Sequence, residues 1–98
     1  MNKIAGLFIC VFLIAVTLTW DASPDANGYK MYCGGSSGSY GSPVDVGNVL
    51  EHPISTPGTY YCAATAYNEA GESGFSNEVF FTIRAIPVVP TNLRLKML

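Results

Sequence analysis

Apolar and polar residues alternate with a period of two along most of the chain after residue 15. In "VTLTW" (residues 16–20), Val16, Leu18 and Trp20 lie on one face of an extended chain, and the two threonines lie on the other. This pattern predicts a half-buried β-strand. Further short segments of strand character, separated by turn-forming clusters, follow at residues 29–33, 44–48, 49–55, 60–67 and 75–83. Six or so short strands with turns between them predict an all-β fold, an antiparallel β-sandwich.

The connections between these segments are rich in glycine, proline, serine, aspartate and asparagine. "GGSSGSYGSP" (residues 34–43) predicts a flexible loop, and "NEAGESG" (residues 68–74) predicts another. Glu69 and Glu72 share the second loop, where solvated charge is the expectation. Pro53 interrupts hydrogen bonding in residues 49–55, which predicts an edge strand or a broken one.

The first fifteen residues follow a different pattern. A lysine at position 3 precedes residues 4–15, "IAGLFICVFLIA", which are apolar and uncharged. This run is shorter than the roughly 20 residues of a membrane-spanning helix and is typical of a signal peptide. Residues 1–15 are therefore expected to be a signal peptide, or an N-terminal membrane anchor if residues 4–18 are retained. The expected location is secreted, periplasmic or at the cell surface.

Charge is unevenly distributed along the chain. Residues 16–83 contain a single basic residue, Lys30, against seven acidic residues, whereas Arg84, Arg94 and Lys96 lie in the C-terminal tail. Nucleic-acid binding requires a basic face, so an acidic body argues against such a partner.

Catalytic and metal-binding patterns find little support in the sequence. His52 is the only histidine, so no cluster with normal zinc-ligand spacing can be assembled around it. The serines of residues 34–43 lack the strand-to-helix context of a nucleophile motif. We therefore expect no enzyme activity, no metal site and no cofactor.

Three motifs in order, "VTLTWDAS", "GYKMYCG" and "PGTYYCAATAYNEAGESGFSNEV", resemble a fibronectin type III domain. The likeness is to the small secreted versions found in bacteria and their phages, and it covers residues 16–84. It implies an immunoglobulin-like antiparallel sandwich with Leu18 and Trp20 in the core of its second strand. It further implies that Tyr29 and Met31 point inward. Tyr60 matches the corner tyrosine of the family, whose hydroxyl bonds to nearby backbone.

One departure from the family concerns strand A, for which there is no room between Ala15 and Val16. Strand 16–20 would then have an open edge, which native sheets usually cover. Residues 85–98 begin as a Pro-rich linker and end in a strand-like pattern, because Leu93, Leu95 and Met97 alternate with basic residues. We predict that residues 91–98 supply the missing strand along residues 16–20, in the same chain or in a neighbouring copy. The alternative is a plain linker with a disordered end.

The two cysteines outside the N-terminal segment, Cys33 and Cys62, both occupy inward positions of their strands. In the resembled fold these strands are antiparallel neighbours, which places the end of one beside the start of the other. We predict a Cys33–Cys62 disulfide, the alternative being two buried thiols that act as small hydrophobic residues.

Tyr32, Tyr61 and Tyr67 occupy the outward positions of the same two strands. We expect their rings to cluster on one exposed face, as a binding surface or as cross-strand pairs that stabilise the sheet. The function expected from the sequence is an exported, non-catalytic binding or adhesion module for a protein or carbohydrate ligand. The alternative is a structural, self-assembling subunit of a surface or virion that donates its C-terminal strand.

Overall fold

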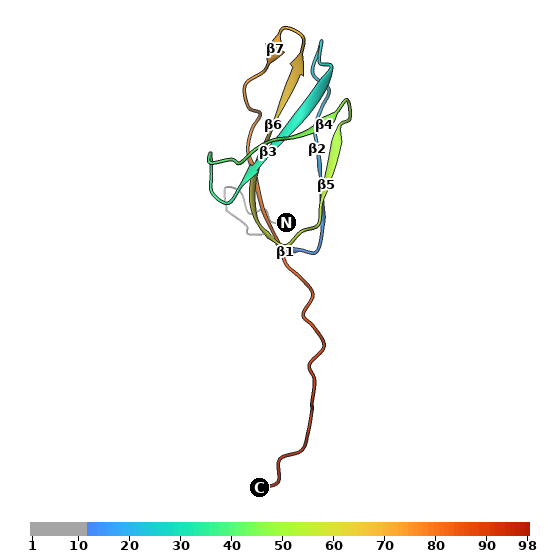
Figure 1. Cartoon of the computed structure of the whole chain (residues 1–98), viewed down its shortest axis with the longest axis vertical. Coiled ribbons are helices and arrows are strands. Elements are labelled where there is room, and N and C mark those ends of the chain that lie inside the picture. The colour runs from blue at the N-terminus through green and yellow to red at the C-terminus, as the bar shows by residue number, and fades with distance from the viewer. Residues whose placement is uncertain (1–11) are drawn as a thin grey trace, which may run out of the picture.

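The computed structural model describes residues 12–98, which form two β-sheets and no helix (Figure 1). The eight strands are β1 (Phe12–Leu13), β2 (Val16–Thr19), β3 (Gly28–Gly34), β4 (Val44–Gly47), β5 (Glu51–Ile54), β6 (Gly58–Asn68), β7 (Gly71–Glu72) and β8 (Val79–Ile83). The larger sheet has the order β1-β8-β6-β3-β4, with β7 paired to β6, and the smaller sheet consists of β2 and β5. The chain is therefore an all-β sandwich, as its alternating pattern predicts.

The smaller sheet explains how Pro53 fits into a strand. The Trp20 amide donates to the Leu50 carbonyl at 3.1 Å, and Thr17 lies opposite Pro53. Backbone groups alternate between the two edges of a strand in an antiparallel pair. Pro53 therefore stands where its missing N–H would point away from β2, and β5 is an edge strand.

The larger sheet is built around β6, the longest strand. It pairs antiparallel with β3 on one side and with β8 on the other. On the far side of β8, β1 runs parallel to it, with Phe12 opposite Thr82 and Leu13 opposite Ile83. The sandwich thus begins before Val16, the first residue that the sequence assigned to it. The expected signal segment otherwise falls on residues 1–11, which lie outside the described part of the chain.

The core lies between the two sheets and is small. Met31, Cys62, Phe81 and Ile83 are buried, and Val16, Leu18 and Ile54 of the smaller sheet pack against them with Trp20, Cys33, Val46, Tyr60 and Ala64. Tyr29 is also buried. The residues expected in the core are thus placed there, although Leu18, Trp20 and Tyr60 keep part of their surface exposed.

Tyr60 stands at the corner between β5 and β6. Its hydroxyl donates to the backbone carbonyl of Thr56 at 2.6 Å, and its ring stacks on Phe81. This is the contact that the family resemblance implies for a corner tyrosine.

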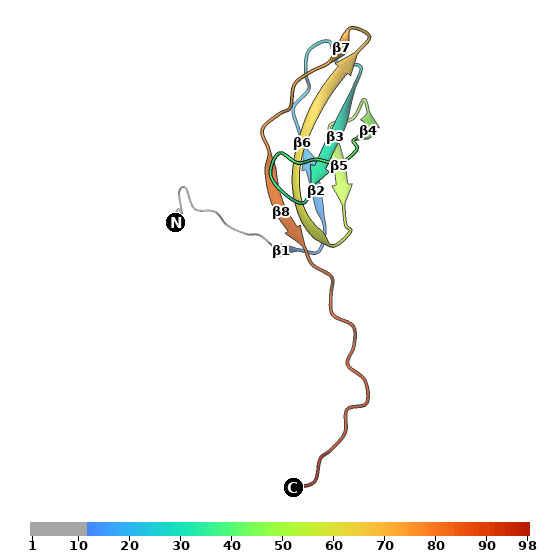
Figure 2. The same cartoon turned by 60° about the vertical axis from the view of Figure 1, so that its left-hand side comes forward.

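The C-terminal tail forms no strand. Residues 84–98 leave the sandwich at the end where β8 finishes, and the tail runs away from the body (Figures 1 and 2). The expectation that residues 91–98 pair with β2 of the same chain is therefore wrong. Leaving β8 in its own direction carries the tail away from both sheets, and pairing with β2 would require it to turn back.

Candidate binding surface

The outer face of the larger sheet displays the aromatic side chains that the sequence singles out. In the β3–β6 register, Tyr32 lies opposite Ala63, Gly34 opposite Tyr61, and Gly28 opposite Tyr67. These positions alternate with the inward residues Met31 and Cys62, so all three tyrosines lie on the outer face.

The three tyrosines do not form one cluster. Tyr61 stacks on Phe80 of β8 at a centroid distance of 4.6 Å. Tyr67 donates a hydrogen bond to the Asp45 carboxylate, and the Lys30 ammonium lies 5.6 Å from its ring centre. Tyr61 and Tyr67 are six residues apart on one strand, which is about 20 Å. The expectation of a single cluster is wrong because β6 is long enough to separate them.

Tyr32 instead belongs to a cluster with two aromatic residues from loops. Its ring centre lies 4.9 Å from that of Phe75 in an edge-to-face contact, and Tyr40 makes a similar contact with Phe75 at 5.2 Å. Tyr32 and Tyr40 are half-buried, whereas Phe75 remains 58% exposed. We call Tyr32, Tyr40 and Phe75 the aromatic cluster.

Glu72 fixes one side of the aromatic cluster. Its carboxylate accepts hydrogen bonds from the Tyr32 hydroxyl at 2.6 Å and from the Thr65 hydroxyl at 2.7 Å. Lys30 lies 3.8 Å from the other carboxylate oxygen. The hydrogen bond from Tyr32 is the main reason why the pKa of Glu72 is lowered, and the same bond raises the pKa of Tyr32. Glu72 is thus part of the surface and not a solvated loop charge.

Glu78 orients the other tyrosine of the aromatic cluster, Tyr40, and binds the glycine-rich loop of residues 34–43. Its carboxylate accepts hydrogen bonds from the Tyr40 hydroxyl, the Ser37 hydroxyl and the Gly38 amide. These bonds lower the pKa of Glu78, that from Tyr40 most, and Tyr40 has a raised pKa in turn. Backbone hydrogen bonds also hold this loop: the Ser39 amide donates to the Ser36 carbonyl, and the Gly41 amide donates to the carbonyl of Cys33 at the end of β3. The loop expected to be flexible is anchored across the sheet.

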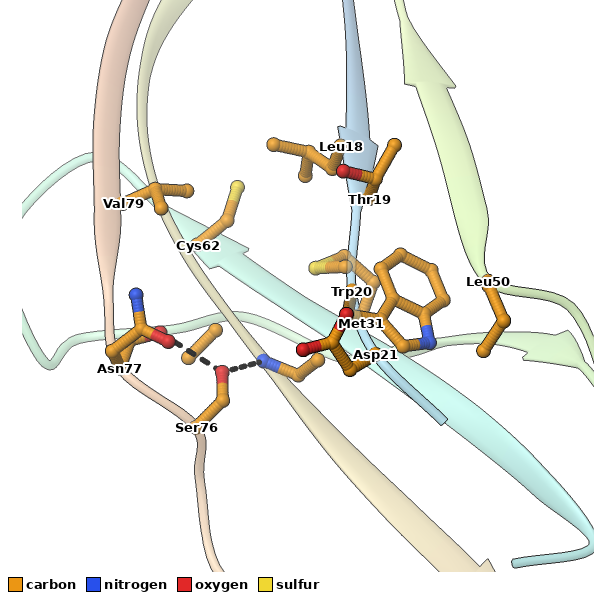
Figure 3. A pocket seen from close by; sticks show the side chains of 12 residues that line it. Leu18, Thr19, Trp20, Asp21, Met31, Leu50, Cys62, Ser76, Asn77 and Val79 are labelled. Carbon is orange, nitrogen blue, oxygen red and sulfur yellow. Dashed lines mark hydrogen bonds between the residues drawn. The ribbon is translucent and has the colours of Figure 1, made fainter. Parts of the chain in front are cut away.

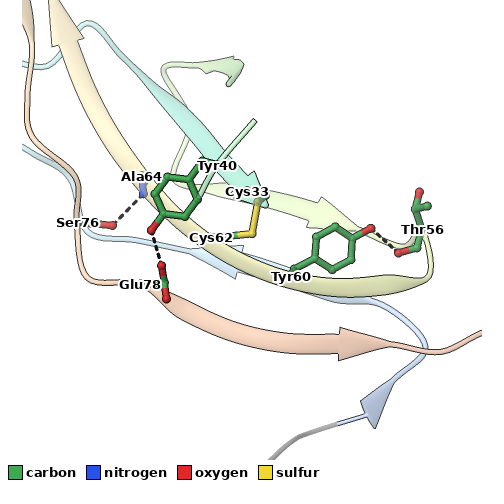
Figure 4. The surroundings of a disulfide bond; sticks show 8 residues. All are labelled: Cys33, Tyr40, Thr56, Tyr60, Cys62, Ala64, Ser76 and Glu78. Atoms are coloured by element: carbon green, nitrogen blue, oxygen red, sulfur yellow. Dashed lines mark hydrogen bonds between the residues drawn. A yellow bond between two sulfur atoms is a disulfide. The ribbon is translucent and has the colours of Figure 1, made fainter. Parts of the chain in front are cut away.

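Cys33 and Cys62 form a disulfide beneath this face (Figure 4). They are a directly opposed pair of β3 and β6, with Cα atoms 4.2 Å apart. That separation is typical of a non-hydrogen-bonded antiparallel pair. The bond therefore joins two strands of one sheet, and it lies on the inner side of the strands that carry the aromatic cluster.

A groove of about 740 Å³ opens between the two sheets, between β2 and the start of β8, with Met31 of β3 in its lining (Figure 3). Leu18, Trp20 and Leu50 line one wall, and Asn77 and Val79 line the other. Val79 pairs with Cys62 and faces inward, yet it is 40% exposed. The sandwich is thus open along the edge of β2.

Among residues 12–98, no three His, Cys, Asp or Glu side chains come together in a way that could hold a metal ion. The two carboxylates of the aromatic cluster accept hydrogen bonds from its tyrosines, an arrangement that orients rings. The same part of the chain contains no helix that could cross a membrane.

Comparisons with known proteins bear on the fold. A scan against protein-family models found no match, and a search of curated proteins found none either. A search of solved structures found the solution structure of a fibronectin type III domain derived from the human KIAA0970 protein. The two chains are 17% identical with a TM-score of 0.57, and the match covers 89% of this chain and 77% of the other. The chain therefore has a fibronectin type III-like β-sandwich fold.

Proposed function

We propose that the chain is an exported, non-catalytic binding module that presents the aromatic cluster to a protein or carbohydrate ligand. The observation that carries this proposal is the position of Phe75. A large apolar ring, 58% exposed, is held edge-on by two tyrosines on the outer face of a sheet. Aromatic rings of this kind provide contact area for sugars and proteins at a low cost in conformational entropy.

The carboxylates beside the cluster favour ligand binding in two ways. Glu72 and Glu78 hold the hydroxyls of Tyr32 and Tyr40, so those rings are ordered before a ligand arrives. A preorganised surface loses less freedom on binding. Both carboxylates are ionised near neutral pH, as glutamates ordinarily are, and their lowered pKa extends this to more acidic solutions; in that form they can accept hydrogen bonds from ligand hydroxyl or amide groups.

Export is supported by the disulfide and by the N-terminal pattern. Disulfides persist mainly in oxidising compartments, and Cys33–Cys62 joins the two strands that carry the surface. The apolar run of residues 4–15 fits the same route.

The proposal is tested by probing an array of immobilised oligosaccharides and a displayed peptide library with the labelled protein. Phe75→Ser removes the exposed ring, and Val49→Ser removes an exposed apolar side chain elsewhere. We expect at least one ligand that Phe75→Ser binds about tenfold or more weakly. Val49→Ser should bind it as the wild type does. Ligands whose binding is the same in all three proteins would contradict the proposal.

A further inference from the structure

β2 has an open edge that offers backbone hydrogen bonds. Trp20 and Leu18 direct their backbone groups toward β5, as the bond from the Trp20 amide to Leu50 shows. Thr17 and Thr19 therefore direct their N–H and C=O groups to the opposite edge. Among residues 12–98, no strand pairs with β2 on that edge. Such an edge is a template for one more strand.

The same edge borders the apolar groove. Leu18 of β2 and the following residue, Trp20, line one side of it, and Val79 of β8 lines the other side. A strand added to the edge of β2 with apolar side chains facing inward would cover these residues. A strand that alternates apolar and polar residues would therefore fit this edge, because its apolar side chains would face the groove and its polar side chains would face solvent.

The tail of the chain has this pattern. Leu93, Leu95 and Met97 are 98%, 92% and 86% exposed and share one face of an extended segment. Arg94 and Lys96 lie on the other face. Asn92 has a φ of 58°, which bends the backbone there and makes residues 93–98 the segment able to pair. Six residues span about 20 Å, enough to cover β2.

The direction of the tail relative to β2 determines whether it can pair with its own chain or with a second copy. β2 rises from the end of the sandwich at which β8 finishes, and the tail descends from that same end (Figure 1). To lie antiparallel to its own β2, the tail would have to climb beside the sandwich and turn back. A tail that descends onto the far end of a second copy, stacked below in the same orientation, runs antiparallel to that copy's β2 without turning.

Charge favours the same arrangement. Arg94 and Lys96 would lie on the outer face of the smaller sheet, where Glu51 stands opposite Thr19. Asp21 also lines the groove. The receiving body is acidic and the donated strand is basic, which assists association between copies.

We propose that residues 93–98 of one copy pair with the open edge of β2 in a second copy and fill its groove with Leu93, Leu95 and Met97. Each copy then donates one strand and accepts another, so the contact is head-to-tail and builds chains without closing. This contact is separate from the aromatic cluster.

The test starts with the purified full chain in sedimentation experiments from low micromolar to millimolar concentration. We expect oligomers that grow with concentration and dissociate at high salt. A triple variant, Leu93→Ser, Leu95→Ser and Met97→Ser, should weaken self-association by about tenfold or more. Val88→Ser with Val89→Ser removes exposed apolar surface from the linker and should leave assembly unchanged, as should Phe75→Ser.

A synthetic peptide of residues 90–98 identifies the receiving edge. It should bind the triple variant, whose own tail cannot compete, and the same peptide with three serines should not. Thr19→Pro removes an N–H from the open edge while leaving the bonds to β5, and it should abolish peptide binding. Thr19→Val keeps the backbone and should retain it. A full chain that stays monomeric, oligomers that survive the triple substitution, or a peptide that does not bind would each overturn the proposal.

Discussion

Cys33 and Cys62 lie directly opposite each other on β3 and β6 and are joined by a disulfide within one sheet. The bond closes a loop with a sequence separation of 29. In the loop-entropy treatment, such a cross-link contributes about 3–4 kcal/mol to the free energy of unfolding. Replacing both residues by alanine should lower that free energy by about this amount, as measured by chemical denaturation.

Non-reducing peptide mapping of the exported protein should show Cys33 and Cys62 in one linked fragment. Reduction of the wild type should lower its stability to nearly that of the double alanine variant. Free thiols at both positions, or a denaturation curve that a reductant does not move, would contradict the pairing.

Trp20 is partly buried and packs against the core. Its ring lies 5.8 Å from that of Tyr29, and its buried Nε1 has no acceptor among the described residues. Trp20→Ala should cost about 3 kcal/mol because it leaves a cavity in a small core. Trp20→Phe keeps most of the packing and removes the unpaired donor, so it should cost less than about 1.5 kcal/mol. Equal costs for the two variants would mean that the ring does not pack as described.

Glu78 determines the order of the glycine-rich loop. Glu78→Ala removes the acceptor shared by Ser37, Gly38 and Tyr40. The Gly38 amide should then exchange with solvent faster, and the Tyr40 ring should lose its fixed contact with Phe75 in NMR spectra. Ser37→Ala removes one of the three donors and should have a smaller effect. Unchanged exchange at Gly38 in Glu78→Ala would show that the loop is held by other contacts.

The hydrogen bonds between the cluster tyrosines and Glu72 and Glu78 contribute to the pH dependence of stability. The pKa values of Glu72 and Glu78 are lowered from 4.5, so their contribution is complete above about pH 4.5 and is lost as pH falls through the folded values. The pKa values of Tyr32 and Tyr40 are raised from 10.0, so their contribution is lost as pH rises through the folded values. The double variant Tyr32→Phe, Tyr40→Phe removes these hydrogen bonds. When the denaturation midpoint is plotted against pH, its decrease at acid pH and its decrease at alkaline pH should both become smaller. An unchanged decrease at acid pH would contradict this.

The sandwich could be predicted from the sequence because its strands alternate cleanly and its motifs occur in family order. The place of Tyr60 at the corner, and of Cys33 beside Cys62, could be predicted because the motifs around them resemble those of a fibronectin type III domain. The alternation of apolar and polar residues depends only on neighbouring positions, so it can be read from the sequence wherever a strand is regular.

The composition of the binding surface could not be predicted in the same way. In regular alternation Phe75 would share the inward face of Phe81, but residues 73–78 are irregular and turn its ring to the outer face. Tyr40 reaches Phe75 only because the glycine-rich loop folds over the sheet onto Glu78. The hydrogen bond between Tyr40 and Glu78 joins residues 38 positions apart in sequence, and no local sequence pattern predicts it.

For the C-terminal tail, the alternation of apolar and polar residues predicts a strand but does not predict the direction in which the tail leaves the sandwich. Leu93, Leu95 and Met97 have the alternation of a strand, which predicts pairing along residues 16–20 but does not distinguish β2 of the same chain from β2 of a neighbouring copy. The sequence does not show at which end of the sandwich β8 delivers the tail. That geometry separates a strand that can be added within the chain from one that can be donated to a second copy.

Among residues 12–98, the fibronectin type III-like sandwich leaves one edge of β2 without a paired strand. Amide hydrogen exchange, measured on monomeric protein carrying the triple tail substitution, tests it most directly. We expect Leu18 and Trp20 to be protected by their bonds to β5, and Thr17 and Thr19 to exchange at least about a hundredfold faster. Adding the peptide of residues 90–98 should then protect Thr17 and Thr19. Equal protection of all four amides before the peptide is added would contradict an open edge, because it would show that another segment already covers Thr17 and Thr19.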